Sequence, residues 1–221
     1  MSGTGPKQAL FARFAAVAQA LAHAHRLELL EHMAQGERSV ERLAALTSIS
    51  VANASQHLQQ LKTTGLVASR RDGKFVLYRL ADESVLALLT SLRRVAERSV
   101  AEVDRILRDY FFDRDALEPV SREELLAQMR DGLVTVLDVR PRDEFALGHI
   151  PGAVNVPASE LEARLRDLDG SREVIAYCRS AYCVLSFEAV AMLRDHGFTA
   201  RRLEEGLPEW KAAGFLVETG A

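Results

Sequence analysis

The chain has 221 residues and a mass of 24.4 kDa, which is room for one large domain or two of about 100–150 residues each. Hydrophobic residues make up 48% and charged residues 27% of the sequence, so the chain can bury cores and is not a disordered protein. No segment approaches the roughly 20 apolar residues of a membrane-spanning helix, and the N-terminus lacks the apolar run of a signal peptide. Two cysteines, Cys178 and Cys183, are too few for a disulfide framework, so we expect a cytoplasmic protein without membrane contacts.

The net charge of −3 is unevenly distributed along the chain. The first 115 residues hold 16 basic and 13 acidic side chains, whereas the remaining residues hold 12 and 18. Residues 50–79 contain five basic side chains and a single acidic one. A basic segment on an acidic protein indicates either a polyanion site confined to one part of the chain or a solvated charged face.

Apolar residues recur at helical spacing in the first part of the chain. We predict four helices there, over residues 6–23, 24–35, 40–46 and 51–64. Ser39 and Ser50 precede the last two helices and have the side chains of N-caps. Because only the short polar turn 47–49 separates these two helices, the spacing predicts a helix-turn-helix.

A β-hairpin is predicted to follow this motif. Residues 66–69 and 75–80 are rich in β-forming side chains, and the basic segment 70–74 between them contains an Asp-Gly pair, a strong hairpin signal. Residues 83–108 then have the pattern of one long helix. Its apolar face is larger than a small domain can cover, which predicts a partner subunit.

Residues 109–118 carry no clear period and are interpreted as a linker. From residue 119 onward, strand and helix patterns alternate, which predicts a parallel sheet. The fold class is therefore two domains: a mainly α-helical winged helix-turn-helix domain at 1–108 and an α/β domain at 119–221. A buried-type strand at 174–177 delivers Cys178 to its carboxyl end, where parallel sheets place their ligand sites.

The helix that begins after Ser50 has the composition of a DNA recognition helix. Leu58 and Leu61 are expected to face the core, while amide and hydroxyl side chains suit base edges, and the basic hairpin suits phosphates. His57 fits a structural role near the turn as well as it fits DNA contact. The predicted DNA-binding residues are Ser50, Asn53, Ser55, Gln56, His57, Gln59, Lys62, Arg70, Arg71 and Lys74.

The segment from Cys178 to Cys183 joins the predicted strand to a helix. A thiol facing a helix N-terminus and loop N–H groups, with Arg179 adjacent, should have a lowered pKa and exist as thiolate. The alternative is a buried apolar cysteine. Cys183 is placed to form a disulfide with an oxidised or persulfidated Cys178, to coordinate together with it, or only to pack. Two cysteines without a neighbouring histidine cannot complete a tetrahedral zinc site, so no metal site is predicted.

Residues 5–100 resemble the ArsR/SmtB type of winged-helix repressor. The resemblance is carried by the segment Ser50 to Leu58, by Leu66-Val67, and by the hairpin residues Gly73-Lys74-Phe75 and Tyr78-Arg79-Leu80. It implies a homodimer that binds a palindromic operator in double-stranded DNA. Metal-sensing members carry paired cysteines before the turn or a histidine-containing set on the last helix. This chain has no cysteine in 40–44 and no histidine in 83–108, so metal sensing is not expected.

Residues 119–219 resemble the rhodanese domain, in the segments Leu137 to Phe145, Gly148 to Pro157, Tyr177 to Arg179 and Glu205 to Trp210. The resemblance implies that Cys178 accepts sulfur as a persulfide held by the amides of a loop, here Arg179, Ser180, Ala181, Tyr182 and Cys183. It assigns Asp138, Arg140 and Glu144 to structural support of that loop. The chain departs from the common loop at Ala181, where glycine is usual, and at Cys183, where arginine is frequent.

Val184 stands where phosphatases and arsenate reductases need arginine, so neither activity is expected, and efficient thiosulfate turnover is in doubt. We interpret the chain as a dimeric DNA-binding repressor whose operator binding is coupled to persulfide or redox chemistry at Cys178. Its expected partners are operator DNA, a second copy and a small sulfur donor such as thiosulfate or polysulfide, without a cofactor. One alternative is a rhodanese-type sulfurtransferase whose first half mainly dimerises. Another is a constitutive DNA-binding protein with an inert rhodanese fold.

Overall fold

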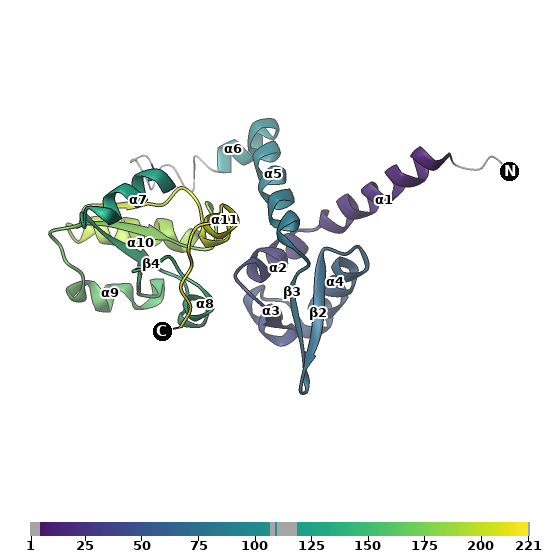
Figure 1. Cartoon of the computed structure of the whole chain (residues 1–221), viewed down its shortest axis with the longest axis horizontal. Helices are drawn as coiled ribbons and strands as arrows, with labels where there is room; N and C mark the ends of the chain where they lie inside the picture. Colours follow the sequence, from purple (N-terminus) through teal and green to yellow (C-terminus); the bar gives the residue numbers. More distant parts are fainter. Residues whose placement is uncertain (1–4, 107–108, 110–118, 221) are drawn as a thin grey trace. The chain divides into compact units, whose positions relative to one another are not determined.

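A computed structural model describes residues 5–106, 109 and 119–220 (Figure 1). The chain separates into two compact units, Met1–Thr90 and Ser91–Ala221, which we describe individually. Except for Asp109, the predicted linker 109–118 lies outside the described residues. Within the described ranges, no helix has both the length and the apolar character needed to cross a membrane.

The first unit opens with four helices, which confirms the predicted helix-turn-helix. They are α1 (Pro6–Leu21), α2 (Ala24–Ala34), α3 (Val40–Leu46) and α4 (Val51–Thr63). The hydroxyl of Ser39 accepts a hydrogen bond from the backbone N–H of Arg42, and that of Ser50 accepts one from Asn53, each at 3.2 Å. Both serines therefore cap their helices, as their position before an apolar-periodic segment predicts.

The core of this unit lies between α2, α3 and α4. Leu29, Leu30 and Leu43 are fully buried, together with Leu58 and Leu61 from α4. Because α4 buries these leucines, its polar residues are left on the remaining faces of the helix.

A three-stranded antiparallel sheet in the order β1-β3-β2 completes the winged part of the unit. Its strands are β1 (Arg38–Ser39), β2 (Val67–Asp72) and β3 (Phe75–Leu80), and Asp72 pairs with Phe75. The predicted loop 70–74 is therefore too long, because the turn consists only of Gly73 and Lys74. Gly73 has φ 59°, a left-handed conformation that allows strand pairing to continue up to a two-residue turn. The hairpin projects beyond the helices of its unit (Figure 1).

As far as Ile106, the predicted helix 83–108 is two helices, α5 (Glu83–Ser99) and α6 (Ala101–Ile106). Residues 107 and 108 lie outside the described residues. The break falls at Val100, whose N–H donates to the Ala96 carbonyl while its own carbonyl accepts from the N–H of Val103. The tighter three-residue spacing ends the α-helical ladder. No glycine or proline occurs between 83 and 106, so the residues that most often end helices do not mark this break.

The second unit is built on a four-stranded parallel sheet in the order β5-β4-β6-β7. The strands are β4 (Val134–Asp138), β5 (Val154–Asn155), β6 (Glu173–Tyr177) and β7 (Ala200–Arg202). Its helices are α7 (Arg122–Arg130), α8 (Arg142–Leu147), α9 (Leu161–Arg164), α10 (Val184–Asp195) and α11 (Leu207–Ala212), with short 3₁₀ turns at Ala158–Glu160 and Leu165–Asp167.

Successive residues of β6 point to opposite faces of the sheet and enter two separate cores. Val174 and Ala176 pack with α10, whereas Ile175 and Tyr177 pack with Trp210 of α11. The sheet is thus covered on both faces, as the alternating pattern predicts for a parallel sheet. The two-domain fold class expected from the sequence is confirmed.

Candidate functional site

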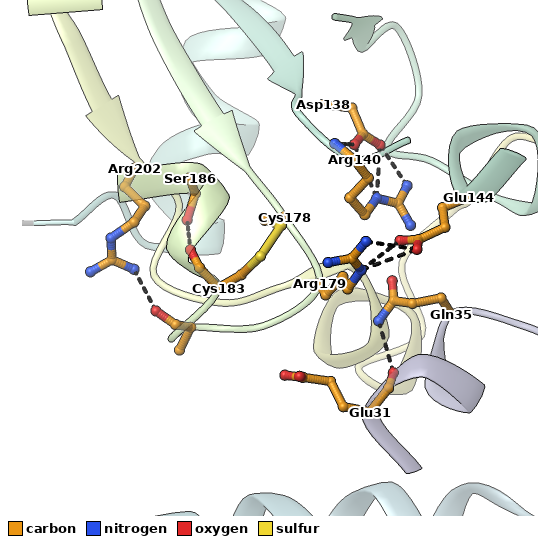
Figure 2. Close-up of a disulfide and its surroundings, with 11 residues drawn as sticks. Glu31, Gln35, Asp138, Arg140, Glu144, Cys178, Arg179, Cys183, Ser186 and Arg202 are labelled. Carbon is orange, nitrogen blue, oxygen red and sulfur yellow. Dashed lines mark hydrogen bonds and ion pairs between the residues drawn. A yellow bond between two sulfur atoms is a disulfide. The ribbon is translucent and has the colours of Figure 1, made fainter. Parts of the chain in front are cut away.

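Cys178 and Cys183 are joined by a disulfide (Figure 2). Cys178 directly follows β6, and Cys183 is the N-cap of the twelve-residue helix α10, with 6.1 Å between the two Cα atoms. The backbone N–H of Cys183 donates to the carbonyl of Ser180 at 3.2 Å, which closes the intervening loop. This cysteine loop, residues 178–183, therefore connects a strand end to a helix start through both the main chain and the sulfur atoms.

The two cysteines differ in exposure. Cys178 is 1% exposed and packs in the apolar cluster that contains Val139 and Ala176, whereas Cys183 is half-buried. The sequence predicts a reactive thiolate at 178, but the structure buries this sulfur among apolar side chains while the disulfide is intact. Because thiol–disulfide exchange requires access to a sulfur atom, Cys183 is the member of the pair that an external thiolate can reach.

The guanidinium of Arg179 is directed to Glu144 of α8 (Figure 2). Its Nε lies 2.9 Å and its Nη2 2.9 Å from carboxylate oxygens of Glu144, whose side chain is 1% exposed. From the sequence, Arg179 is expected to supply charge beside the Cys178 thiolate, whereas in the structure its charge neutralises a buried carboxylate. Arg179 and Glu144 therefore position the cysteine loop against α8.

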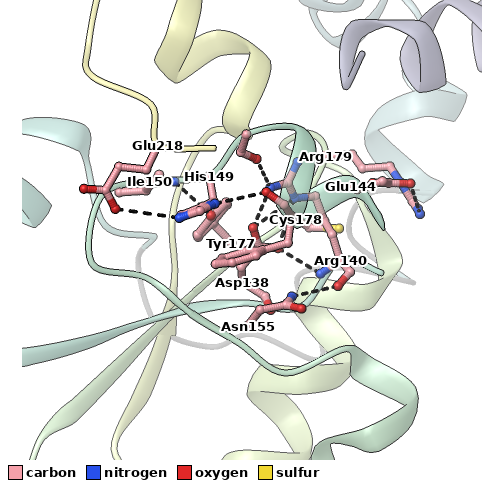
Figure 3. A network of polar contacts seen from close by, with 12 residues as sticks. Asp138, Arg140, Glu144, His149, Ile150, Asn155, Tyr177, Cys178, Arg179 and Glu218 are labelled. Carbon is pink, nitrogen blue, oxygen red and sulfur yellow. Dashed lines mark hydrogen bonds and ion pairs between the residues drawn. The ribbon is translucent and has the colours of Figure 1, made fainter. Parts of the chain in front are cut away.

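Asp138 and Arg140 form a second buried ion pair near the end of β4 (Figure 3). Arg140 Nη2 lies 2.5 Å from Asp138 and also donates to the carbonyl of Gly148 at 2.7 Å. Burial opposes the charge of Arg140, but the hydrogen bond and negative charge of Asp138 raise its pKa. The amide of Asn155 donates to the carbonyls of Asp138 and Arg140 at 3.0 and 2.9 Å. This network ties the turn after β4 to the neighbouring strand β5.

Three residues from outside the cysteine loop support its backbone. Arg202 of β7 donates to the carbonyl of Ala181 at 3.2 Å, and Ser186 of α10 donates to the carbonyl of Cys183 at 2.9 Å. Gly206 lies so close that a Cβ atom there would overlap the backbone of Arg179 and Ser180. The sequence analysis does not identify these residues as supports, although Gly206 belongs to a segment that resembles the rhodanese domain.

Tyr182 links the cysteine loop to α5 within the second unit. Burial, followed by a hydrogen bond to Glu97, raises the pKa of the Tyr182 hydroxyl. About one turn earlier in α5, Arg93 Nη1 lies 3.4 Å from the carboxylate of Glu209 in α11. The last two turns of α5 therefore contact both the cysteine loop and α11.

The predicted DNA-binding residues of α4 fall into different environments. Asn53 and Gln56 are exposed, and the hydroxyl of Ser50 is occupied by the helix cap. Gln59 Nε2 donates to the hydroxyl of Tyr78 at 3.4 Å, and Lys62 Nζ donates to Ser69 Oγ at 2.8 Å. Gln59 and Lys62 are thus on the side of α4 next to the hairpin, while Ser55 is half-buried.

The hairpin presents three basic side chains that differ in how they are bound. Arg70 pairs with Glu37 at 2.6 Å and with Asp72 at 3.4 Å, and lies in β2 rather than in the predicted loop. Arg71 and Lys74 are exposed, with the Lys74 ammonium 5.3 Å from the centre of the Phe75 ring. Arg71 and Lys74 are therefore better placed than Arg70 to meet an external phosphate.

His57 points to the start of α2 and is half-buried. Its ring centre lies 4.4 Å from that of His23 and 5.9 Å from that of His25. Burial lowers the pKa of His57, and the nearby His23, Arg26 and His25 lower it further. His57, His23 and His25 therefore form a histidine cluster between α4 and the start of α2.

A winged helix-turn-helix followed by a parallel α/β unit with a cysteine loop defines a DNA-binding regulator fused to a rhodanese-like domain. Comparison with protein families agrees with this class. Residues 24–69 match the family of bacterial regulatory proteins called arsR, and residues 121–213 match the rhodanese-like domain.

Among characterised sequences, the chain is 43% identical over 215 residues to the HTH-type transcriptional regulator Rv0324 of Mycobacterium tuberculosis, covering 97% of this chain and 94% of the relative. The second half is 30% identical over 102 residues to a sulfurtransferase of Allochromatium vinosum, covering 46% of this chain and 92% of the relative. A solved winged-helix domain from Mycobacterium bovis, described as homodimeric, is 42% identical, covers 45% of this chain and 94% of its own, and has a TM-score of 0.41. The chain belongs to the ArsR-type HTH transcriptional regulators and carries a C-terminal rhodanese-like domain.

Proposed function

We propose that this DNA-binding transcriptional regulator represses its target genes as a homodimer, and that its operator affinity depends on the sulfur chemistry of Cys178 and Cys183. The observation that carries the proposal is the disulfide between the end of β6 and the N-cap of α10. A bond that can be made and broken at this junction changes the covalent structure of the loop. Because a bacterial regulator must reach the DNA, we infer that this protein acts in the cytoplasm.

The first chemical step is sulfur transfer to Cys178 in the reduced protein. The Cys178 thiolate attacks the outer, sulfane sulfur of thiosulfate, the sulfur–sulfur bond of thiosulfate breaks, and sulfite leaves with the bonding electrons. Cys178 then carries a persulfide. With a polysulfide as donor the leaving group is the shortened polysulfide chain. Because Cys178 is buried in the disulfide form, the reduced loop must open a path for the donor.

The second step closes the disulfide. The thiolate of Cys183 attacks the inner sulfur of the Cys178 persulfide, the bond to the outer sulfur breaks, and hydrosulfide leaves. The product is the bond that joins the two cysteines in the structure. The N-terminus of a helix stabilises negative charge, so the N-cap position of Cys183 favours its thiolate.

Reduction breaks the disulfide again and begins at the sulfur of Cys183, which is the more accessible of the two. A cellular thiolate attacks the sulfur of the half-buried Cys183 and forms a mixed disulfide with it, while Cys178 leaves as thiolate. A second thiolate then releases Cys183. This order follows from the different exposures of the two cysteines, because attack at Cys178 would require entry into the apolar cluster.

Coupling to DNA is supported by contacts of α5. Tyr182 of the cysteine loop bonds to Glu97, and Arg93 pairs with Glu209, so the end of α5 is in contact with the loop and with α11. Earlier in the same helix, Val85 and Leu89 belong to the core of the winged-helix unit. A loop state that favours one placement of α5 shifts operator affinity by about 1–3 kcal/mol, or 5–150-fold.

The homodimer is supported by apolar side chains that the first unit and α5 leave uncovered. Leu10, Phe11 and Phe14 of α1 are 52–58% exposed, and Leu92 and Val95 of α5 are 40–60% exposed. Two helices with such faces bury them most readily against a second copy of the chain.

A gel shift on the DNA upstream of the protein's own gene tests the proposal. We expect reduced wild-type protein to bind the DNA and polysulfide to change its affinity at least fivefold. Cys178→Ser and Cys183→Ser should no longer form the disulfide and should not show the full response. Ala181→Ser is the matched control, because it changes the same loop and keeps both cysteines. Equal responses of wild type and Cys178→Ser would contradict the proposal and favour an inert rhodanese fold.

A sulfurtransferase is the second candidate, favoured by the similarity of the second half to the enzyme of Allochromatium vinosum. Two features oppose efficient turnover. Cys183 occupies a position where the rhodanese loop frequently has arginine. Arg179 forms an ion pair with Glu144, so its charge is not directed at the cysteines. Appreciable transfer of sulfur from thiosulfate to cyanide, with no change in DNA affinity, would favour the enzyme.

A further inference from the structure

Three histidines from two helices meet in the first unit. His23 is the N-cap of α2, His25 lies in the first turn of that helix, and His57 comes from α4. One ring nitrogen of each lies within 4.8 Å of a ring nitrogen of the other two. His25 is 5.3 Å from His23 between ring centres. The three side chains are therefore close enough to bind one small ligand together.

We propose that His23, His25 and His57 bind a divalent transition-metal ion such as Zn²⁺, Co²⁺ or Ni²⁺. Imidazole nitrogen is a preferred ligand of these ions, whereas Mg²⁺ and Ca²⁺ require oxygen ligands. The sequence predicts no metal site, because two cysteines without a neighbouring histidine cannot complete a zinc site and neither ligand pattern of the ArsR/SmtB resemblance is present. The three histidines follow neither pattern, since residues 25 and 57 are far apart in the chain.

The geometry needs only a small contraction. Around a tetrahedral ion with bonds of about 2.0–2.1 Å, ligand nitrogens lie about 3.3–3.4 Å apart. The rings must therefore approach one another by at most about 1.5 Å from the separation of 4.8 Å. His23 is exposed and His25 is half-buried, so both side chains have room to rotate. Three protein ligands leave the fourth position to water.

A buried nitrogen on His57 supports the site. The Nδ1 atom of His57 is inaccessible to solvent and has no hydrogen-bond partner within the described residues. Buried polar atoms normally have partners, because an unsatisfied one costs about 1–3 kcal/mol. A coordinated ion satisfies the imidazole directly when Nδ1 is the ligand atom. When Nε2 is the ligand, Nδ1 carries the proton and still lacks an acceptor, so the unsatisfied atom favours coordination through Nδ1.

Neighbouring groups act on a bound cation in opposite directions. The positive charge of Arg26 repels a bound cation. The Arg26 guanidinium donates hydrogen bonds to Gln60 Oε1 at 2.7 Å and to the carbonyl of Gln19 at 3.0 Å. The carboxyl group of Glu28 is close enough to His25 to interact electrostatically and attracts a cation. His23 Nδ1 accepts the N–H of His25 at 3.2 Å, and metal binding replaces this helix cap, which costs about 1 kcal/mol.

The ion would connect the N-terminus of α2 to the recognition helix α4. His57 lies one position after Gln56 and two before Gln59, both predicted to contact DNA. Restraining His57 therefore restrains the side chains that meet the bases. The proposal is independent of the cysteine loop and does not require sulfur chemistry.

Titration with Co²⁺ tests the site, because a tetrahedral Co²⁺ complex absorbs visible light. The full chain is used with Cys178→Ser and Cys183→Ser, so that no thiol binds the metal, and without an affinity tag. We expect one Co²⁺ per chain, a visible absorption band, and displacement of Co²⁺ by Zn²⁺. His57→Gln and His23→Gln should each weaken Co²⁺ binding at least tenfold. His196→Gln, an exposed histidine at the end of α10, is the matched control and should bind like the parent.

Circular dichroism of each variant shows whether it folds, and His25→Gln replaces any variant that does not. Absence of Co²⁺ binding by the parent at millimolar concentration would overturn the proposal. So would unchanged binding in the folded His57→Gln and His23→Gln variants, or loss of binding in His196→Gln alone.

Discussion

Arg179 forms an ion pair with Glu144, a residue 35 positions earlier in the sequence, and two nitrogens of its guanidinium each lie 2.9 Å from the buried carboxylate (Figure 3). The pair ties the cysteine loop to α8, the helix that follows the Asp138–Arg140 network. An arginine next to a cysteine in sequence is readily interpreted as an activator of the thiol. Its partner here shows that it holds the loop in place.

Removing the buried charge of Glu144 should destabilise the second unit. Glu144→Gln leaves Arg179 without its negative partner, and breaking a buried ion pair in this way costs about 3–5 kcal/mol. We expect a lower midpoint in urea unfolding. Glu160→Gln is the control, because Glu160 pairs with Arg142 at the surface and should change the midpoint little. Equal midpoints for the two variants would show that the Arg179–Glu144 pair does not stabilise the loop.

Intact-mass measurement should distinguish the two steps of the sulfur chemistry. After treatment with polysulfide, wild-type protein should lose about 2 Da on forming the disulfide, whereas Cys183→Ser should gain about 32 Da as a persulfide on Cys178. Cyanide should remove the added mass, which separates a persulfide from a sulfinic acid of the same nominal mass. Cys178→Ser should show neither species. A persulfide that accumulates on Cys183 in this variant would reverse the proposed roles of the two cysteines.

Tyr182 should transmit the state of the loop without taking part in its chemistry. Tyr182→Phe removes the hydroxyl that bonds to Glu97, so the ratio of operator affinities between reduced and disulfide protein should fall at least threefold. Disulfide formation, followed by mass, should continue. Glu102→Gln is a suitable control, since Glu102 is an exposed acid of α6 that pairs with Arg105. An unchanged affinity ratio in Tyr182→Phe would exclude this route of coupling.

The wing and the recognition helix should contribute differently to DNA binding. Arg71→Ala and Lys74→Ala remove the phosphate contacts that we predict for these side chains, so each should weaken binding to all sequences and reduce the salt slope by about 1. Arg70→Ala should have a smaller effect because Glu37 already engages its charge. Gln56→Ala should cost about 1–3 kcal/mol and relax the preference for particular bases. Binding isotherms at several salt concentrations measure these effects, with Arg130→Ala in α7 as the control. A uniform loss of affinity in Gln56→Ala would argue against base contact.

The helices of the first unit could be predicted because their signals are local. The serines at 39 and 50 precede apolar-periodic segments, and such caps need only the next three residues. The hairpin was predicted for the same reason, but its strands extend to Asp72 and Phe75, since pairing between strands decides where a strand ends. The break at Val100 has no counterpart among the residues that normally end helices.

The sequence by itself determined the two-domain fold, the position of Cys178 at a strand end and the face of α4 that packs in the core, because hydrophobic period, caps and turns depend on residues close together in the chain. Only the tertiary structure decided the environment of each side chain. It placed Arg202 and Gly206 against the cysteine loop, buried the sulfur of Cys178, directed Arg179 to Glu144 and gathered His23, His25 and His57. These contacts join residues that are distant in sequence, so their energies appear only once the chain has packed.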